Sequence, residues 1–590
     1  MSNRWFCAII FIFCGCDAAP LLSILSPAAP PDLHVTYDVN TKTHPPLRLP
    51  PPAPPRPMAE GNALFVDAKN GDDENDGSLE SPWRTVQYAL DQLQAGATLY
   101  LRGGVHYTRA YLSVMGRPGA PVTIASYPGE QAVLDGSFPE FTTDPGTAWV
   151  PVAGGNDEYF SAELYRNLRG VHGCFADSMI GLQTYYLHED LMGPRYCGPG
   201  LWYDPQTGRI HARLAPYTSA KKPVTYPYQA YAGTSNPCFA PIILASSHAL
   251  PLLMDGAAHI VLRDLTIRGG GYDTVEIRHG HDITFENVTL WAGTYGLKAS
   301  NTGPLRLLHC GFYGNLPPWS SRDETSLMEY PWQQKGRNLT RLNTHALLVP
   351  ASVEEYSVYF YPYNHQWEIA GCEFADSHDG VYLGNVDGLD FHHNLVEHLQ
   401  DDGAYLSSFR EIVKPQHGPM LIHENVFREC MITLAFGGDA RLASGVQVYR
   451  NLLGGKIGMG DHGNPPWEVL RVYHNTVTGS VQALFGKTRE KQGADWKIIN
   501  NLLVQPEDKP GKGTGIRRDA DGNVHELREK ALEGEGWRLS GNSSALKAGV
   551  ALPADWPDPQ RGQNQPAPDA GALPAGSGNL AVGRFGRYGF

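Results

Sequence analysis

Residues 446–453 read VQVYRNLL, and the same pattern returns as LRVYHNTV at 470–477 and as WKIINNLL at 496–503. Each copy is a short alternating run that ends in Asn and is followed by an apolar pair. Weaker copies extend the repeat, with the marked residues Asp264, Asn287, Cys310, Cys372, Asn394, Asn425, Asn451, Asn475 and Asn501. These residues are 22 to 31 positions apart, except for one gap of 62, and such a period is typical of a solenoid.

Three short strands per repeat with tight polar turns favour an all-β fold, a single-stranded parallel β-helix. Equivalent residues of successive coils then lie about 4.8 Å apart. An Asn at the same turn of every coil can donate to one neighbour and accept from the other, and we expect its backbone in the left-handed bend that Asn tolerates. Cys310 and Cys372 are expected in the same column as small buried residues.

The chain resembles the right-handed parallel β-helix proteins of the pectate-lyase superfamily over roughly residues 63–575. The stretch from LFVDAKNG to LRGGVHY at 64–107 is similar to the N-terminal cap of secreted members. That similarity implies an amphipathic helix near Trp83 to Leu93 over the open end of the core. PAPDAGALP at 566–574 is similar to their closing segment. These motifs specify the fold better than the reaction.

The chain begins with a short apolar run and small residues, which indicate a signal peptide. Gly15-Cys16 resembles the end of a bacterial lipobox, so Cys16 is the expected lipidation site. We expect an extracytoplasmic protein, secreted or anchored as a lipoprotein in the bacterial cell envelope. The predicted segments are 1–16 signal peptide, 17–60 Pro-rich linker, 61–137 cap and first coils, 138–250 inserted β subdomain, 251–505 coils with an aromatic insertion at 315–365, and 506–590 closing segment.

Composition limits the partners. The net charge is -14 and no Lys/Arg run is present, so we expect no nucleic-acid partner and no membrane contact except through the N-terminal lipid anchor. The 590 residues include 65 Gly and 46 Pro, which indicates frequent turns. We expect the protein to be a monomer. An uncharged or sugar-based partner fits this charge, and we expect a polysaccharide substrate. Outside the β-helix no phosphate loop, Gly-x-Ser-x-Gly or zinc spacing is found.

Two near copies of one turn, HDGVYL at 378–383 and DDGAYL at 401–406, lie 23 residues apart. Since that interval is one coil, we expect Asp379 and Asp402 as surface neighbours on consecutive turns. Like charges about 5 Å apart cannot both ionise freely, so one carboxyl should keep its proton while the other stays charged. Such a pair suits the acid and the base or nucleophile of glycosidic-bond hydrolysis.

The same turns place His378 beside Asp401, with Asp376 two positions earlier. A purely structural explanation also exists, because Gly accepts positive φ and Asp hydrogen-bonds its own backbone in tight turns. We favour catalytic roles for all five residues of the two turns, because interacting titratable groups within two coils mark functional sites.

Two resemblances imply different reactions. Gln400-Asp401-Asp402 resembles the Gln-Asp-Asp of polygalacturonase-type glycoside hydrolases, although their Asn-Thr before the first Asp and their later Gly-His-Gly are missing. DSHD at 376–379 resembles the Asp-Pro-His-Asp of mannuronan C5-epimerases, with Ser in place of Pro. Lyases of the superfamily use a Lys or Arg base, often with Ca²⁺ held by stacked Asp. Candidate bases here are Lys298, Arg410 and Lys414.

The sequence therefore predicts a polysaccharide-active β-helix enzyme, with hydrolysis favoured over uronate β-elimination or epimerisation. A non-catalytic carbohydrate-binding or adhesive β-helix is the alternative from another class. Hydrolysis requires no cofactor, and Ca²⁺ is the candidate cofactor of a lyase. We expect substrate contacts from outward-facing residues and from residues of the insertion. Sugar rings stack on aromatic rings, which favours the aromatic members of this set. The expected residues are Lys298, Tyr382, Tyr405, Arg410, Tyr361 and Trp367.

Overall fold

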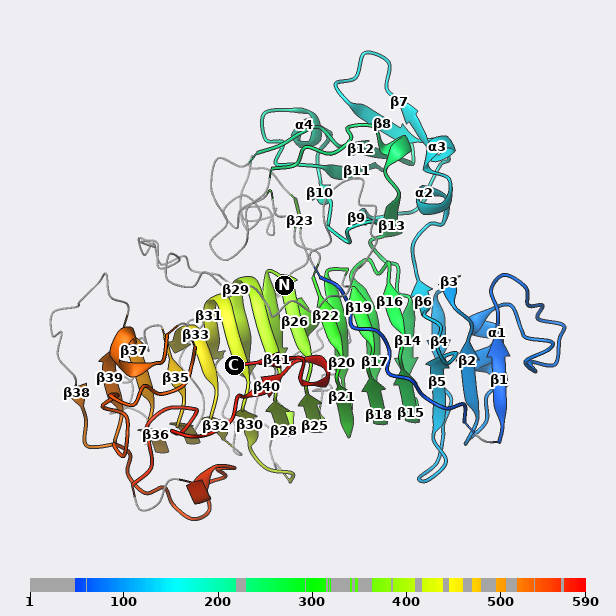
Figure 1. Ribbon diagram of the computed structural model, residues 1–590. Coiled ribbons are helices and arrows are strands. Elements are labelled where there is room, and N and C mark those ends of the chain that lie inside the picture. The colour runs from blue at the N-terminus through cyan, green and yellow to red at the C-terminus, as the bar shows by residue number, and fades with distance from the viewer. Residues whose placement is uncertain are drawn as a thin grey trace, which may run out of the picture.

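The described strands wind into a parallel β-helix (Figure 1). The computed structural model describes residues 48–59, 61–218, 230–291, 293–314, 317, 319, 340–341, 345–348, 363–383, 386–408, 416–438, 445–459, 469–478, 495–505, 517–534, 536–563 and 567–590. Successive coils contribute one parallel strand each to a sheet whose 12 described strands are, in order, β1 (Ala63–Val66), β2 (Thr98–Leu101), β5 (Val122–Ser126), β15 (Ala258–Arg263), β18 (His281–Glu286), β21 (Leu305–Leu308), β25 (Asn364–Ala370), β28 (Val386–His392), β30 (Met420–His423), β32 (Val446–Tyr449), β34 (Val469–Tyr473) and β36 (Asp495–Ile499).

The other strands of the coils form one sheet of 19 described strands. Many coils give it two strands in separate parallel columns, so that β16 pairs with β19 while β17 pairs with β20. The predicted arrangement of three strands per coil is confirmed. The strands are β3 (Gly104–Tyr107), β4 (Ala110–Leu112), β6 (Ala132–Asp135), β14 (Leu252–Asp255), β16 (Thr266–Arg268), β17 (Asp273–Arg278), β19 (Thr289–Trp291), β20 (Tyr295–Ser300), β22 (Gly311–Tyr313), β24 (His345–Leu348), β26 (Glu373–Ser377), β27 (Asp379–Leu383), β29 (Leu395–Ser408), β31 (Val426–Gly438), β33 (Leu452–Met459), β35 (Thr476–Val477), β37 (Leu502–Gln505), β38 (Arg517–Arg518) and β39 (Val524–Leu527).

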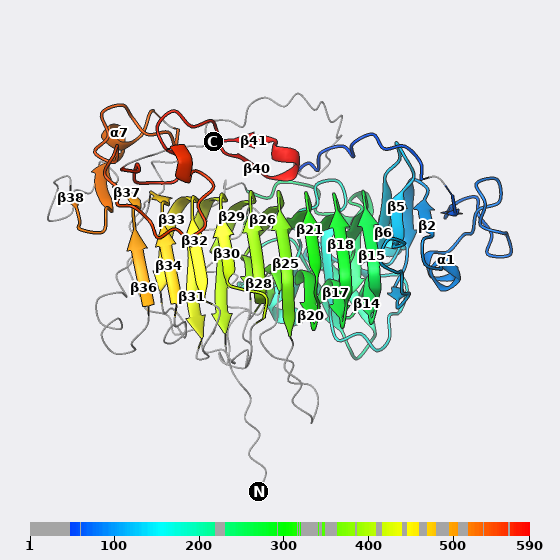
Figure 2. The same ribbon diagram turned by 90° about the horizontal axis from the view of Figure 1, so that it is seen from below.

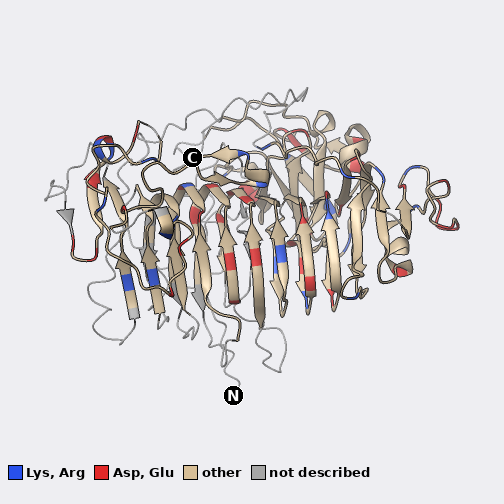
Figure 3. Ribbon diagram, turned by 60° about the horizontal axis from the view of Figure 1, so that its bottom comes forward, with Lys and Arg blue, Asp and Glu red and all other residues tan. Residues whose placement is uncertain are grey.

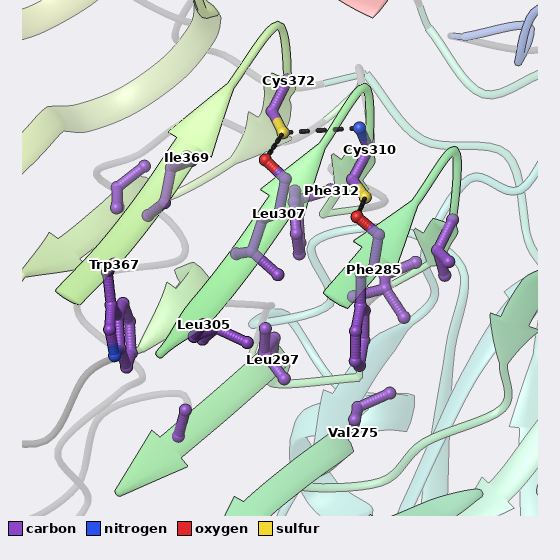
Figure 4. Close-up of a cluster of buried hydrophobic side chains, with 14 of the residues drawn as sticks. Val275, Phe285, Leu297, Leu305, Leu307, Cys310, Phe312, Trp367, Ile369 and Cys372 are labelled. Atoms are coloured by element: carbon purple, nitrogen blue, oxygen red, sulfur yellow. Dashed lines mark hydrogen bonds between the residues drawn. The ribbon is translucent and has the colours of Figure 1, made fainter. Parts of the chain in front are cut away.

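Alternation along each strand separates the core from the outer face, because successive side chains of a strand point to opposite sides. In β18, Ile283 and Phe285 are fully buried in the core, whereas Glu286 is partly exposed. Figure 4 shows Phe285, Leu307 and Ile369 on neighbouring strands of this core, where they lie in register. Acidic and basic positions lie on neighbouring strands of the coils (Figure 3), and Arg306, for example, is in register with Glu368.

The predicted asparagine column closes one turn of the β-helix. The main-chain N–H and the side-chain amide of Asn394 donate to Oδ1 of Asn425, at 2.9 and 3.0 Å. The amide of Asn394 also donates to the main-chain oxygen of Ile369 at 2.8 Å. The same bonds to the next side chain recur along the ladder, which runs through Asn394, Asn425, Asn451, Asn475, Asn501 and Asn523. The sequence repeat did not predict Asn523 as a member of this ladder.

Cys310 and Cys372 occupy the same column, and both are fully buried. The main-chain N–H of Cys310 donates to Sγ of Cys372 at 3.4 Å (Figure 4). Asp264 and Asn287 were assigned to this column wrongly, because they lie one position earlier, where φ is 56° and 55°. The left-handed bend belongs to that earlier position, as at His393 with φ 55°, and not to the Asn of the ladder as we had expected.

The 62-residue gap between Cys310 and Cys372 is a single coil. Strand β21 pairs directly with β25, and β24 lies between β20 and β27. Residues 315–365, expected as an insertion alone, therefore contain a regular strand of the coil. Strand β23 (Thr340–Arg341) of the same segment pairs with β10 of the inserted subdomain.

Helix α1 (Val86–Gln92) covers the open N-terminal end, as the resemblance implied, and buries three side chains against the first coils. The predicted inserted β subdomain lies beside one flank of the β-helix (Figure 1) and has its own apolar core. Its described elements are α2 (Glu140–Thr143), α3 (Pro145–Ala148), β7 (Trp149–Pro151), β8 (Glu158–Ser161), β9 (Val171–Phe175), β10 (Gln183–Tyr185), α4 (His188–Met192), β11 (Gly200–Asp204), β12 (Arg209–Arg213), η2 (Pro237–Phe239) and β13 (Ile242–Ser246). Strands β11 and β12 form an antiparallel hairpin.

Residues 48–59 lie along the outside of the β-helix, beside the C-terminal segment (Figure 2). The described end of the predicted Pro-rich linker 17–60 is docked on the β-helix through Arg48 and Arg56. No helix within the described ranges is long and apolar enough to cross a membrane. The closing elements are α7 (Arg528–Ala531), η3 (Arg561–Gln563), β40 (Ala581–Val582), η4 (Arg584–Gly586) and β41 (Tyr588–Gly589).

Candidate active site

The two acidic turns lie one coil apart, as their spacing predicted. Strand β27 begins at Asp379, and its partner β29 contains Asp402. Tyr382 is in register with Tyr405, which places the two aspartates at equivalent positions of neighbouring strands. The main-chain N–H of Asp402 donates to Oδ1 of Asp379 at 3.1 Å.

The glycine after each aspartate is required by close packing. A Cβ atom on Gly380 would lie 2.4 Å from the main-chain oxygen of Gly403, and one on Gly403 would lie 2.5 Å from that of Thr433. Neither glycine has positive φ, so the reason we gave from the sequence is wrong at this turn. Only Gly fits between the stacked strands here. The glycines let the two coils that carry the adjacent carboxylates pack closely.

His378 and Asp401 complete what we call the acidic-turn cluster: His378, Asp379, Asp401 and Asp402. Nε2 of His378 lies 3.7 Å from Oδ2 of Asp401, whose main-chain N–H donates to the His378 oxygen at 2.8 Å. One donor atom each of His378, Asp379 and Asp401 lie within 4.8 Å of one another. The four residues are only 6–8% exposed, so the expectation that both aspartates lie at the surface is wrong.

The rings of Tyr382 and Tyr405 face away from the β-helix core, as expected, and their centroids are 5.1 Å apart. Both tyrosines are nevertheless buried, since they pack with Ile432 and Ala435 in a small apolar cluster outside the sheet. Lys298 is also outside the core, but Leu348 of β24 separates it from Tyr382 along the column. Its ammonium group lies 3.5 Å from Glu276 and 3.9 Å from Asp273, away from the acidic-turn cluster.

Trp367 was predicted to contact substrate, and this is wrong. Its side chain lies in the core in register with Leu305 and Leu389, and it is 1% exposed. Its indole N–H donates to the main-chain oxygen of Thr302 at 2.8 Å. The alternation of Trp367 and Ile369 around a polar Glu368 would have indicated this burial. Four other predicted residues, Cys16, Tyr361, Arg410 and Lys414, lie outside the described residues.

Asp376 belongs to a different network, which we call the Arg48 cluster: Arg48, Asp376, Glu397, His398, Arg428 and Glu429. Arg48 comes from the N-terminal segment, and its Nε lies 3.3 Å from Oδ2 of Asp376. Arg48 also pairs with Glu397, which accepts from Arg428 at 2.6 Å.

His398 lies between the acidic members of the Arg48 cluster. Its Nδ1 is 3.4 Å from Asp376, and its Nε2 pairs with Glu429. Burial alone would lower the pKa of His398, but the surrounding carboxylates, Glu397 first, outweigh burial and raise it to about 10. Burial would raise the pKa of Glu397, but Arg48 and His398 outweigh it and lower that pKa well below its ordinary value. The cluster is therefore a charged, internally compensated network.

No sequence signal pointed to the Arg48 cluster. Arg48 is 328 positions from Asp376, and the positive φ shared by Asp376, His398 and Glu429 follows from stacking and not from a motif. The structure therefore separates Asp376 from the acidic-turn cluster by charge environment, although the two are adjacent in sequence.

The acidic-turn cluster could hold a cation through two carboxylates and one imidazole. Ca²⁺ takes six to eight oxygen ligands, whereas the described part of the chain offers three donors here, one of them a histidine nitrogen. The arrangement instead suits acid–base chemistry, because carboxylates and an imidazole converge at one turn.

Comparison with known proteins gives short or weak similarities. No protein-family model matches the chain. A stretch of 76 residues, 13% of this chain and 16% of the relative, is 34% identical to the uncharacterised protein YwoF of Bacillus subtilis. A stretch of 69 residues, 11% of this chain and 17% of the relative, is 35% identical to pectate lyase PEL9 of Emericella nidulans. Both matches span less than a fifth of the curated relatives.

Solved structures align over more of the chain at low identity. A glycoside hydrolase aligns with 79% of this chain and 94% of its own, at 9% identity and a TM-score of 0.42. Pectate lyase Pel9A aligns with 88% of this chain and 97% of its own, at 15% identity and a TM-score of 0.39. The chain is a parallel β-helix protein.

Proposed function

We propose that this chain is a polysaccharide-active enzyme that hydrolyses glycosidic bonds at the acidic-turn cluster. The observation that carries the proposal is the stacking of Asp379 on Asp402, with His378 and Asp401 alongside. The main-chain N–H of Asp402 donates to the side-chain Oδ1 of Asp379 at 3.1 Å. Two carboxyl groups beside one bond are the minimum machinery of glycoside hydrolysis.

The geometry suggests how the roles divide. The main-chain N–H of Asp402 donates to Oδ1 of Asp379 and stabilises negative charge on that carboxylate. Asp379 therefore suits the role of base or nucleophile. Asp402 is then the acid that protonates the leaving oxygen, and Asp401 is held by His378. Strands in register are about 4.8 Å apart. That spacing is near the roughly 5–5.5 Å of retaining glycosidases and below the roughly 6.5–9.5 Å of inverting ones.

The test is product analysis with purified protein on a panel of neutral and acidic polysaccharides. Hydrolysis releases reducing ends without an unsaturated, ultraviolet-absorbing product. Retention of anomeric configuration, followed by nuclear magnetic resonance, supports the assigned roles, whereas inversion contradicts them. An unsaturated product would instead indicate a lyase, and binding without any product would indicate a carbohydrate-binding or adhesive β-helix.

A uronate lyase or C5-epimerase is the second candidate, favoured by the imidazole of His378 beside two carboxylates. The epimerase-like motif also needs Asp376, and Asp376 is engaged by Arg48 and His398. We therefore place hydrolysis first. We also propose an extracytoplasmic location with Cys16 as lipid anchor, which Cys16→Ser would shift from the membrane fraction to the soluble fraction.

A further inference from the structure

Two histidines and a glutamate converge in the inserted subdomain, remote in sequence from the acidic-turn cluster. Nε2 of His188 lies 2.6 Å from Oε1 of Glu158, and Nδ1 of His211 lies 2.7 Å from the same oxygen. One donor atom from each residue lies within 4.8 Å of the other two. A single carboxylate oxygen therefore accepts from two imidazoles.

Three separate elements supply this cluster (Figure 1). Glu158 begins β8, His211 lies in β12, and His188 begins α4. Strands β8 and β12 are antiparallel with Phe160 opposite His211, so Glu158 and His211 share one face of the sheet. Trp202 is opposite His211 on that face, and its ring lies 4.8 Å from each imidazole. The indole thus packs against both histidines and restricts their rings.

Burial and charge make this more than a surface ion pair. The side chain of Glu158 is 6% exposed and that of His211 is 15% exposed, whereas His188 is 46% exposed. Arg213, which is in register with Glu158, turns its guanidinium to the main-chain oxygens of Asn156 and Leu191. A buried carboxylate therefore faces two imidazole nitrogens, and the cluster opens to solvent on the side of His188.

We propose that Glu158, His188 and His211 form a binding site for a divalent transition metal of the Zn²⁺ class. Two imidazoles and one carboxylate are the three-ligand set that Zn²⁺ takes where a fourth position stays open to solvent. The residues lie 30 and 23 positions apart, which matches no linear zinc motif, so the sequence did not reveal them. Bound metal would tie α4 to the sheet of the subdomain.

The donor atoms are close enough to be drawn around a metal. In a tetrahedral site with bonds of about 2.0–2.1 Å, neighbouring donors are roughly 3.3 Å apart. The 2.6 and 2.7 Å distances therefore need to widen by less than about 1 Å, which the half-exposed His188 allows. The metal would take the place of the two ring protons that now lie between the imidazole nitrogens and Glu158.

The test is titration of the chelator-treated full chain with Co²⁺, followed by its visible spectrum and by calorimetry, with Zn²⁺ displacing Co²⁺. We expect one equivalent with an intense spectrum of four-coordinate Co²⁺ and nitrogen ligands. His188→Ala and Glu158→Gln should each weaken binding by more than the roughly 10- to 100-fold that loss of an outer-shell partner costs. Because His188 is exposed, its replacement leaves the sheet intact.

Two matched variants separate this site from others. His248→Ala removes an exposed histidine of the same subdomain and should leave binding unchanged. Asp401→Asn alters the acidic-turn cluster and should also leave this spectrum unchanged, so the outcome is independent of the proposed glycosidase activity. Absence of Co²⁺ and Zn²⁺ binding, or binding that survives both His188→Ala and Glu158→Gln, would overturn the proposal.

Discussion

Two groups of acidic residues meet at Ser377, and they differ in what surrounds them. On one side, Asp376 lies in the Arg48 cluster, where two guanidinium groups and His398 compensate the carboxylates. On the other side, Asp379 starts the acidic-turn cluster, where carboxylates of two coils stack beside His378. Two aspartates three positions apart thus have different surroundings, because tertiary neighbours and not local sequence decide the charge balance.

The largest expected effect concerns the acidic-turn cluster. Asp379→Asn and Asp402→Asn should each lower hydrolytic activity by roughly 10² to 10⁴, because they remove an acid–base group while an amide keeps the turn. Activity on the responsive polysaccharide and the thermal midpoint should be measured together. A fully active Asp379→Asn protein would show that this turn is only structural.

The second prediction concerns the Arg48 cluster. Arg48→Ala should destabilise the protein by about 3–5 kcal/mol, since it leaves the buried carboxylates of Asp376 and Glu397 uncompensated. Denaturant unfolding measures the loss. Arg56→Ala is the matched control in the same segment, because its partly exposed pairs with Asp264 and Glu286 are worth about 0–1 kcal/mol. Equal effects of the two changes would contradict the contrast.

The third prediction is a pH dependence. His398 has a folded pKa of about 10, above its ordinary value of 6.5. The charged imidazole therefore contributes stability that is fully present below about pH 6.5 and is lost as pH rises toward about 10. Unfolding midpoints measured across this range should fall, and His398→Asn should flatten that decline.

The smallest expected effect lies in the asparagine ladder, away from both clusters. Asn451→Ala should cost about 1–3 kcal/mol, because it leaves the buried main-chain N–H of Asn425 without its acceptor. Cys310→Ala in the same column should cost less, because the Cys310 side chain makes weaker sulfur contacts. Thermal unfolding of the two variants would check the order, and a reversed order would contradict it.

The repeat by itself determined the β-helix, its coil length and the asparagine column, because each coil uses the same local turn and the same alternation of side chains. The interval of 23 residues also placed Asp379 on Asp402 without any structure. The same alternation, read at Trp367 and Ile369, would have corrected the expected substrate contact.

Only the tertiary structure decided which acidic residues are compensated. Arg48 reaches Asp376 across 328 positions, and Glu158 meets His188 and His211 from three elements. It also showed that Gly380 is needed for close approach and not for positive φ. Such contacts depend on packing between segments far apart in the chain. A sequence pattern identifies only residues that are neighbours within one coil or at equivalent positions of successive coils.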